Sequence, residues 1–210
     1  TGYLSFGNFI VDILTGTNRI AINAGSTVMV TQNLTITSGE YRHNCDHYIS
    51  GDLANDGVFA MTGGTLYFAK YENGVETPAT IAQTISGNGL FKNSTNNHNF
   101  NSVGFNNTSA GGITFANANT LKSQVGYLGT VSGWLTLKNG VINTGSNALI
   151  HTQSNAIAYT AGGFGSGSTY ARLYTTAGTG TPITQGAIPT MTTTSYGSYP
   201  FVSGNPVTGM

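Results

Sequence analysis

The chain has 210 residues, of which only 7% are charged, and its net charge is zero. Ordinary globular domains carry about 25% charged residues, so the solubility of this chain depends on its many Thr, Ser and Asn side chains. Seven scattered Lys and Arg residues form no basic patch and predict no nucleic-acid partner, and no apolar run reaches the roughly 20 residues of a transmembrane helix. The 39% hydrophobic content, with 11 Tyr and 10 Phe, favours a packed core over disorder.

Short runs in which apolar and polar residues alternate follow one another along the chain. Each run has period two and is closed by Gly, Asn or Ser, which is typical of short strands joined by turns. The clearest runs are residues 19–23, 27–31, 34–37, 65–68, 112–115 and 135–138. Because no stretch shows a helical period of 3.6 residues, the chain is predicted to be all-β.

Internal echoes favour a β-solenoid over a β-sandwich or barrel. Leu-Thr-Ile-Thr-Ser-Gly at 34–39 returns as Leu-Thr-Leu-Lys-Asn-Gly at 135–140, and the Gly-Gly segment at 63–69 is echoed at 111–116. Both spacings are near multiples of a coil of about 24 residues. A third motif, an aliphatic residue followed by Ser-Gly at 49–51, 85–87 and 131–133, does not fit that period. We therefore expect a right-handed parallel β-helix whose coils differ in length.

The composition changes near residue 162. Residues 1–161 are predicted to form the parallel β-helix coils. Residues 162–210 are rich in Gly, Ser and Thr and keep aromatic residues, so we expect a cap, an irregular sheet or the junction to a following module. The chain begins with Thr1, which fits a segment of a longer protein.

The sharpest local cluster is His43-Asn44-Cys45-Asp46-His47. In an extended strand, His43, Cys45 and His47 would project to one face and supply three ligands for zinc or copper. The alternative is that they fill a coil edge, with Cys45 as a small buried residue. Because residues i and i+2 of a strand lie about 7 Å apart, three such ligands require a bend.

A catalytic site is not expected. The β-helical polysaccharide lyases and glycoside hydrolases use carboxylates, and residues 77–210 contain neither Asp nor Glu. The only candidate cluster is Asp46, Asp52 and Asp56, and the last two lie beside glycines in ordinary turn sequences. We expect a protein that is not an enzyme and has no cofactor.

Exposed aromatic residues support an alternative function. Tyr67 and Trp134, with Tyr71 and Tyr159, would stack on sugar rings if they lie on a flat solenoid face. The chain would then be a carbohydrate-binding or polysaccharide-cleaving β-helix. Ice binding is a further alternative, but the Thr spacing is too irregular for it.

Several segments together resemble a known repeat family: Ile-Asn-Ala-Gly-Ser-Thr-Val at 22–28, Asn-Leu-Thr-Ile-Thr-Ser-Gly at 33–39, Asn-Asp-Gly-Val-Phe at 55–59 and Gly-Val-Ile-Asn-Thr-Gly at 140–145. The pattern is similar to the β-helical repeats of very large Bacteroidetes surface adhesins exported by the type IX secretion system, including gliding-motility adhesins. The resemblance implies an extracellular or cell-surface location and a structural or adhesive role. The implied partners are adjacent coils or domains of the parent chain, the outer-membrane secretion machinery and surface glycans.

Overall fold

The structure, a computed structural model, describes residues 2–13, 18–23, 25–93, 99–100, 102–116, 127–128, 135–143, 148–151, 157–159, 163–164, 169–173 and 182–184. These residues form strands and turns and contain no helix, which confirms the all-β prediction. Consequently no described segment is a helix that could span a membrane.

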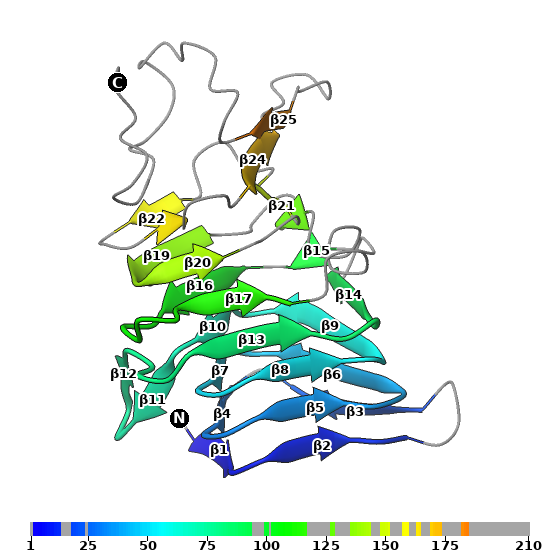
Figure 1. Ribbon diagram of the computed structural model, residues 1–210. Helices are drawn as coiled ribbons and strands as arrows, with labels where there is room; N and C mark the ends of the chain where they lie inside the picture. The colour runs from blue at the N-terminus through cyan, green and yellow to red at the C-terminus, as the bar shows by residue number, and fades with distance from the viewer. Residues whose placement is uncertain are drawn as a thin grey trace.

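Two parallel sheets of seven strands run the length of the described structure (Figure 1). Sheet A contains, in spatial order, β1 (Gly2–Phe6), β4 (Ser26–Val30), β7 (His47–Ile49), β10 (Leu66–Phe68), β16 (Val103–Asn106), β19 (Leu135–Asn139) and β22 (Ile157–Tyr159). Sheet B contains β2 (Phe9–Val11), β5 (Leu34–Ile36), β8 (Leu53–Asn55), β13 (Gln83–Ser86), β17 (Ile113–Phe115), β20 (Val141–Asn143) and β23 (Gly163–Phe164).

The remaining strands form two further sheets and a hairpin. Sheet C contains β3 (Arg19–Ile22), β6 (Glu40–Asn44), β9 (Val58–Gly63) and β14 (Leu90–Asn93). Sheet C′ contains β15 (Asn99–Phe100), β18 (Tyr127–Leu128), β21 (Ala148–His151), β24 (Thr169–Leu173) and β25 (Pro182–Thr184). The hairpin joins β11 (Lys70–Glu72) to β12 (Val75–Thr77). Among the described strands, only the pairs β11–β12 and β24–β25 are antiparallel.

The chain passes through sheets A, B and C in turn and then returns to sheet A beside the strand that it left. We call each such round a tier. The first three tiers are β1–β3, β4–β6 and β7–β9, and the fourth contains β10, β13 and β14. Val28 pairs with His47 and Leu34 with Leu53, so the step from the second tier to the third is 19 residues. Successive tiers therefore place equivalent residues directly beside one another, from the bottom to the top of Figure 1.

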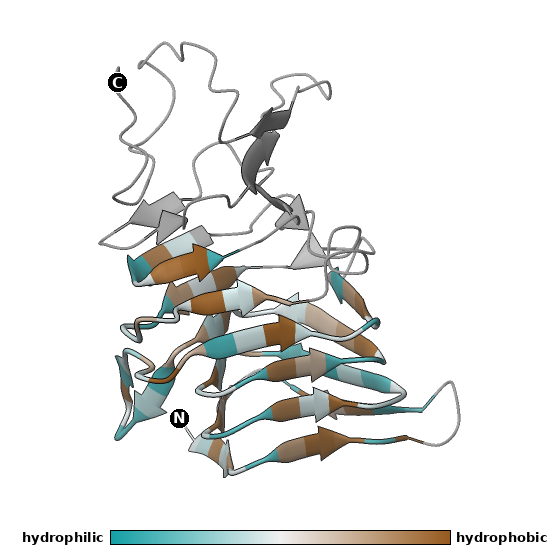
Figure 2. Ribbon diagram, viewed as in Figure 1, coloured by the Kyte–Doolittle hydropathy of each residue, from teal (hydrophilic) through white to brown (hydrophobic). Residues whose placement is uncertain are grey.

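Inward side chains of successive tiers stack on one another and form the core. In sheet C, the rings of Tyr41, Phe59 and Phe91 follow in consecutive tiers, with centroids 5.6 and 5.8 Å apart, and all three are fully buried. In sheet A, Phe68 stacks on Phe105 at 5.5 Å. Burying each such ring contributes about 1.5–3 kcal/mol. Hydrophobic residues accordingly alternate with polar ones along the strands of Figure 2.

The sequence echoes do not mark equivalent positions in the tiers. Residues 34–36 form β5 in sheet B, whereas residues 135–139 form β19 in sheet A. The echoed segments end at Gly39 and Gly140, whose φ angles of 76° and 87° are ones that residues with a side chain rarely adopt. The echo thus records a strand followed by a left-handed glycine, a unit used on more than one face. The predicted period of about 24 residues was wrong in detail, because the step between tiers ranges from 19 residues (Leu34 to Leu53) to 37 residues (Leu66 to Val103).

Parallel pairing continues past residue 162. β23 pairs with β20, and β24 pairs with β21, so residues 163–173 extend the existing sheets. β25 then pairs with β24 in the antiparallel sense. The domain boundary between residues 161 and 162 stays a prediction.

Candidate functional site

The histidine–cysteine cluster lies at the corner between sheets C and A. β6 ends at Asn44, the chain turns at Cys45 and Asp46, and β7 begins at His47. His43 projects inward from β6 and His47 projects inward from β7, and both side chains are fully buried. Their ring centroids are 5.1 Å apart. The corner therefore brings two imidazoles together inside the core.

Each imidazole makes one hydrogen bond. Nδ1 of His43 lies 2.9 Å from the backbone oxygen of Cys45, and a carbonyl oxygen can only accept, so this nitrogen carries the proton. The hydroxyl of Tyr41 lies 3.1 Å from Nδ1 of His47. The Nε2 atoms of His43 and His47 have no hydrogen-bond partner among the described residues. A buried polar atom without a partner costs about 1–3 kcal/mol.

Burial controls the protonation of this corner. It lowers the pKa of His43 to about 4 and holds the pKa of His47 well below 6.5, with the neighbouring His43 adding to the effect on His47. Burial also raises the pKa of the Cys45 thiol, as does the charge of Asp46. Both imidazoles are consequently neutral at pH 7, and the thiol is protonated.

The expected three-ligand arrangement does not form. His43, Cys45 and His47 were expected on one face of a continuous strand, but the strand ends before Cys45 and the two histidines enter the core from different sheets. Within the described ranges, no group of three His, Cys, Asp or Glu side chains is arranged to hold a metal ion. Metal binding here stays a prediction, and the geometry supplies two close imidazoles for it.

The three candidate carboxylates lie at three different corners. Asp46 is at the turn into sheet A, Asp52 at the turn into sheet B and Asp56 at the turn into sheet C. The Oδ1 atom of each accepts a backbone N–H from the following tier, at Thr65, Thr84 and Asn88 respectively, over 2.7–3.0 Å. They do not converge on a common point, and each one satisfies a turn of the next tier.

At the corner between sheets A and B, these bonds form a ladder with one direction. Oδ1 of Asn8 accepts the N–H of Asn33, Oδ1 of Asn33 accepts the N–H of Asp52, and Oδ1 of Asp52 accepts the N–H of Thr84. The distances are 3.1, 2.9 and 2.7 Å. In every step the side chain of one tier reaches forward to the backbone of the next.

Tyr67 projects from the outer face of sheet A, where the carbohydrate hypothesis needs a free ring. Its ring stacks on Tyr48 with centroids 4.6 Å apart, and Tyr48 in turn stacks on Tyr71 at 4.5 Å. The ammonium of Lys138 lies 5.6 Å from the Tyr67 centroid. Because β7 and β19 lie on opposite sides of β10 in sheet A, Tyr48 and Lys138 approach Tyr67 from opposite directions. Both faces of the ring are therefore occupied by the protein itself. Trp134 lies outside the described residues, and for Tyr159 only the backbone is described.

No protein-family model matches the chain, and no curated protein or solved structure is significantly similar to it. Inferences about function consequently rest on the described geometry and on the residue patterns.

The β11–β12 hairpin was missed by the sequence analysis. Asn73 and Gly74 form its turn, with φ angles of 53° and 82°, and Asn-Gly between alternating residues is a strong hairpin signal. Glu76 anchors the hairpin to sheet A through hydrogen bonds with Lys138 and Asn106. The hairpin carries Tyr71 and thereby completes the tyrosine stack.

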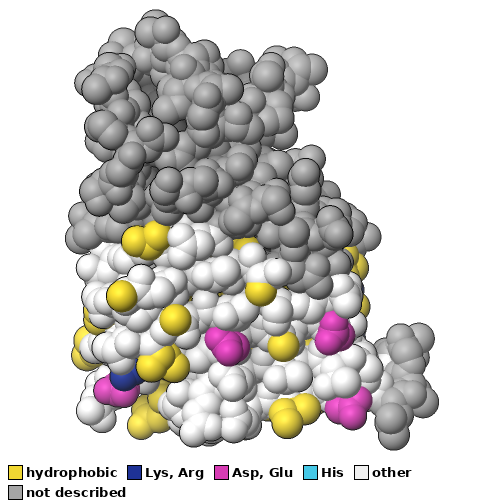
Figure 3. Space-filling view, viewed as in Figure 1, with side chains coloured by type: hydrophobic (Ala, Val, Ile, Leu, Met, Phe, Trp, Pro, Cys, Tyr) yellow, Lys and Arg dark blue, Asp and Glu magenta, His cyan; other side chains and the backbone are white. Residues whose placement is uncertain are grey.

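Charged groups on the outer faces are few, and several pair with one another. In the described part of the face seen in Figure 3, acidic and basic side chains are scattered among uncharged ones. On sheet C, Glu40 binds both Arg42 and Lys92, at 2.6 and 2.7 Å. Burial alone would raise the pKa of Glu40, but Lys92 and Arg42 hold it below its ordinary value.

Proposed function

We propose that this chain is a right-handed parallel β-helix that serves as a structural or adhesive segment of a secreted or cell-surface bacterial protein, without catalytic activity. The observation that carries the proposal is the in-register parallel stacking of successive tiers. Each round of the chain adds one strand to sheets A, B and C, at steps of 19 residues in the middle of the described stack. Such an assembly grows along one axis, as a spacer between a cell surface and its target requires.

The handedness follows from a general rule. Connections between neighbouring parallel strands of one sheet are right-handed in about 98% of proteins. Every step from β4 to β7, and from β5 to β8, is a connection of this kind. We therefore assign the right-handed form of the helix.

The side-chain roles in the described tiers support a structural part. Asp46, Asp52 and Asp56 accept backbone N–H groups at separate corners. The tyrosines of sheet A stack on one another. Each group that the sequence offers for chemistry or sugar binding is thus engaged in holding one tier to another.

The cell-surface part of the proposal rests on the sequence resemblance to adhesins of the type IX pathway. It fits a surface built of uncharged polar residues with 7% charged residues overall. The parent chain would then be cargo of the outer-membrane secretion machinery, with surface glycans as possible adhesion targets.

Immunolabelling of the source bacterium tests this function. An antibody raised against the folded chain is expected to label intact cells, and protease treatment of intact cells should remove the label. A strain that lacks the outer-membrane exporter should retain the antigen inside the cell. Antigen found only after lysis of untreated wild-type cells would overturn the proposal.

A further inference from the structure

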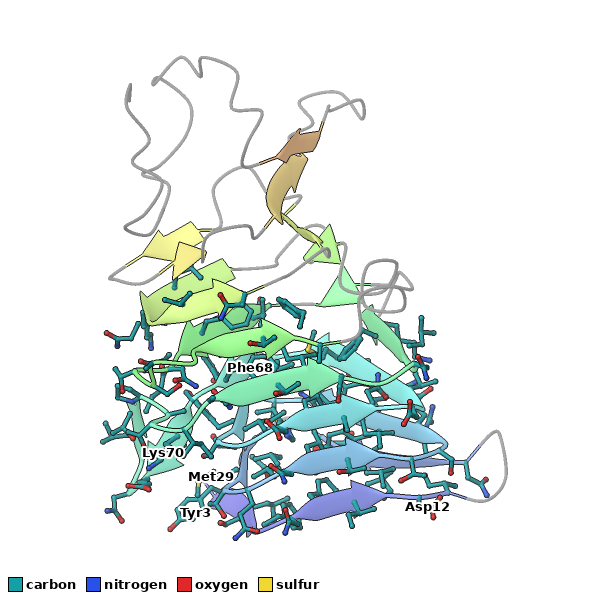
Figure 4. All side chains as sticks on the ribbon, viewed as in Figure 1. Tyr3, Asp12, Met29, Phe68 and Lys70 are labelled. Carbon is teal, nitrogen blue, oxygen red and sulfur yellow. The ribbon has the colours of Figure 1, made fainter. Side chains whose placement is uncertain are left out.

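The first tier has one edge that no described residue covers. β1, β2 and β3 are the terminal strands of sheets A, B and C, and each is paired on one side only. These strands lie at the lower end of the stack, near the labelled residues Tyr3 and Asp12 (Figure 4). An open strand edge presents unpaired N–H and C=O groups and readily pairs with another strand. Here three such edges face the same way.

The core is also open at this edge. Leu4 pairs in register with Val28, and Ile20 with Tyr41. Val28 and Tyr41 are fully buried, whereas Leu4 is 42% exposed and Ile20 is 37% exposed. Equivalent inward positions therefore differ only in whether another tier lies below them.

Exposed apolar residues concentrate at this end of the molecule. Of the six large hydrophobic residues that are exposed in the described part of the chain, four belong to the first tier. They are Tyr3, Leu4, Ile10 and Ile20. A contiguous apolar surface of this kind is typical of an interaction site.

The turn ladder shows which way the edge is oriented. Asn8, Asn33 and Asp52 each reach forward to the N–H of the next tier. Asn8 is the first member of this ladder, and its own N–H faces away from the second tier. A covering tier would complete the ladder by placing an Asn or Asp oxygen opposite that N–H.

We propose that the open edge of β1, β2 and β3 binds a further three-strand parallel β-coil, whose turn carries an Asn or Asp side chain that accepts the N–H of Asn8. The proposal rests on the parallel β-helix proposed above. It continues the contact by which the second tier already covers the first, with the same strand direction and the same inward apolar row. The incoming coil would bury Leu4 and Ile20 as the second tier buries Val28 and Tyr41.

A second copy of the chain fits this edge less well. Two copies meeting by the same edge would face each other with their Asn8 side chains pointing away, toward their own second tiers. Neither copy would then supply the missing acceptor. The direction of the ladder therefore favours a coil that enters from below in the same orientation.

A coil grafted from the chain itself tests the proposal. A copy of residues 26–46 is placed directly before Leu4, so that the copied Asp46 precedes Leu4 as the native Asp46 precedes His47. The copied Asn33 then faces Asn8. The control carries the same graft with Val28→Asp and Leu34→Asp in the copy, because both positions are inward and fully buried in the native second tier.

The active graft is expected to raise the urea midpoint of unfolding and to reduce the binding of an apolar fluorescent dye, relative to the control graft. Asn33→Ala in the copy should remove part of the gain in midpoint. Equal midpoints and equal dye binding for the active and control grafts would overturn the proposal, as would end-to-end dimers of the ungrafted chain that persist after grafting. Failure of the graft would leave the surface-labelling result intact, so failure of the docking edge and of the surface function are distinguishable.

Discussion

At the scale of single residues, the most unusual feature is the pair of buried imidazoles at the corner between sheets C and A. His43 and His47 occupy inward positions that their neighbours in sheets C and A fill with apolar side chains, such as Ile22 and Val28. Each keeps one hydrogen bond and leaves Nε2 without a described partner. Burial penalises the charged form of both rings, so the corner is stable only while they are neutral.

This feature predicts loss of stability in mild acid. Histidine in an unfolded chain has a pKa of about 6.5, whereas the folded pKa is about 4 for His43 and well below 6.5 for His47. Below pH 6.5 the unfolded chain takes up protons that the folded chain refuses, so the free energy of unfolding decreases as the pH falls. Between pH 7 and pH 5, His43 alone should remove about 2 kcal/mol, and His47 acts in the same direction. Urea unfolding at pH 7, 6 and 5, in buffer without added metal, measures this effect.

His43→Phe is the control for the acid effect, because it keeps a ring at the same place without a titrating group. Its free energy of unfolding should depend less on pH over this range. Glu40 titrates below the range, since its pKa is lowered from 4.5. Equal slopes for the wild type and the variant would contradict the assignment.

Gly104 is a second residue whose identity matters. It lies beside Tyr67 in sheet A, and a Cβ atom at this position would overlap the Tyr67 ring. Gly104→Ala should therefore push the ring off its stack with Tyr48 and lower the free energy of unfolding by about 1–3 kcal/mol. In a Tyr67→Ala background the same substitution should cost much less, because the obstructing ring is gone. A double-mutant cycle by urea unfolding measures the difference, and additive costs would contradict the proposed overlap.

At the scale of elements, the strands could be predicted from the sequence, but their register could not. Alternation at Ile20 and Ile22, or at Leu34 and Ile36, is a local property and correctly located β3 and β5. The register depends on turn and loop lengths, and the insertion of the β11–β12 hairpin lengthens the step from Leu53 to Ile85 to 32 residues. The echo at residues 34–39 and 135–140 was misleading, because strands of different sheets share the same strand-and-glycine pattern.

The candidate site was predictable in its composition and not in its geometry. The sequence singled out His43 and His47, but only the turn at Cys45 brings their rings together from two sheets. Likewise Asp46 and Asp52 are neighbours in sequence and lie at different corners. The tyrosine stack needed Tyr71, whose position depends on the hairpin.

The hairpin anchor provides a prediction at this scale. Glu76 is buried against sheet A, with its side chain 12% exposed, and accepts hydrogen bonds from Lys138 and Asn106. Glu76→Gln removes the ion pair and should lower the free energy of unfolding by about 1 kcal/mol. Hydrogen exchange of residues 70–77 should accelerate at the same time. The matched control is Glu72→Gln, an exposed residue of the same hairpin; an equal effect of both substitutions would contradict the anchoring role.

At the scale of the whole molecule, the central claim is that successive tiers stack in parallel, with equivalent residues side by side. Thr35, Ala54 and Ser86 are outward residues of three consecutive strands of sheet B. Neighbouring strands are about 4.8 Å apart and alternate strands about 10 Å apart. A disulfide requires Cα atoms within about 7 Å, so it can join neighbours in this row and cannot skip a tier.

Pairs of introduced cysteines, in a Cys45→Ala background, test this claim most directly. The account predicts that Thr35→Cys with Ala54→Cys, and Ala54→Cys with Ser86→Cys, each form an intramolecular disulfide under mild oxidation, as measured by the loss of free thiols in intact-mass analysis. Thr35→Cys with Ser86→Cys should keep both thiols. A disulfide between positions 35 and 86, or none between 35 and 54, would contradict the parallel stacking of tiers.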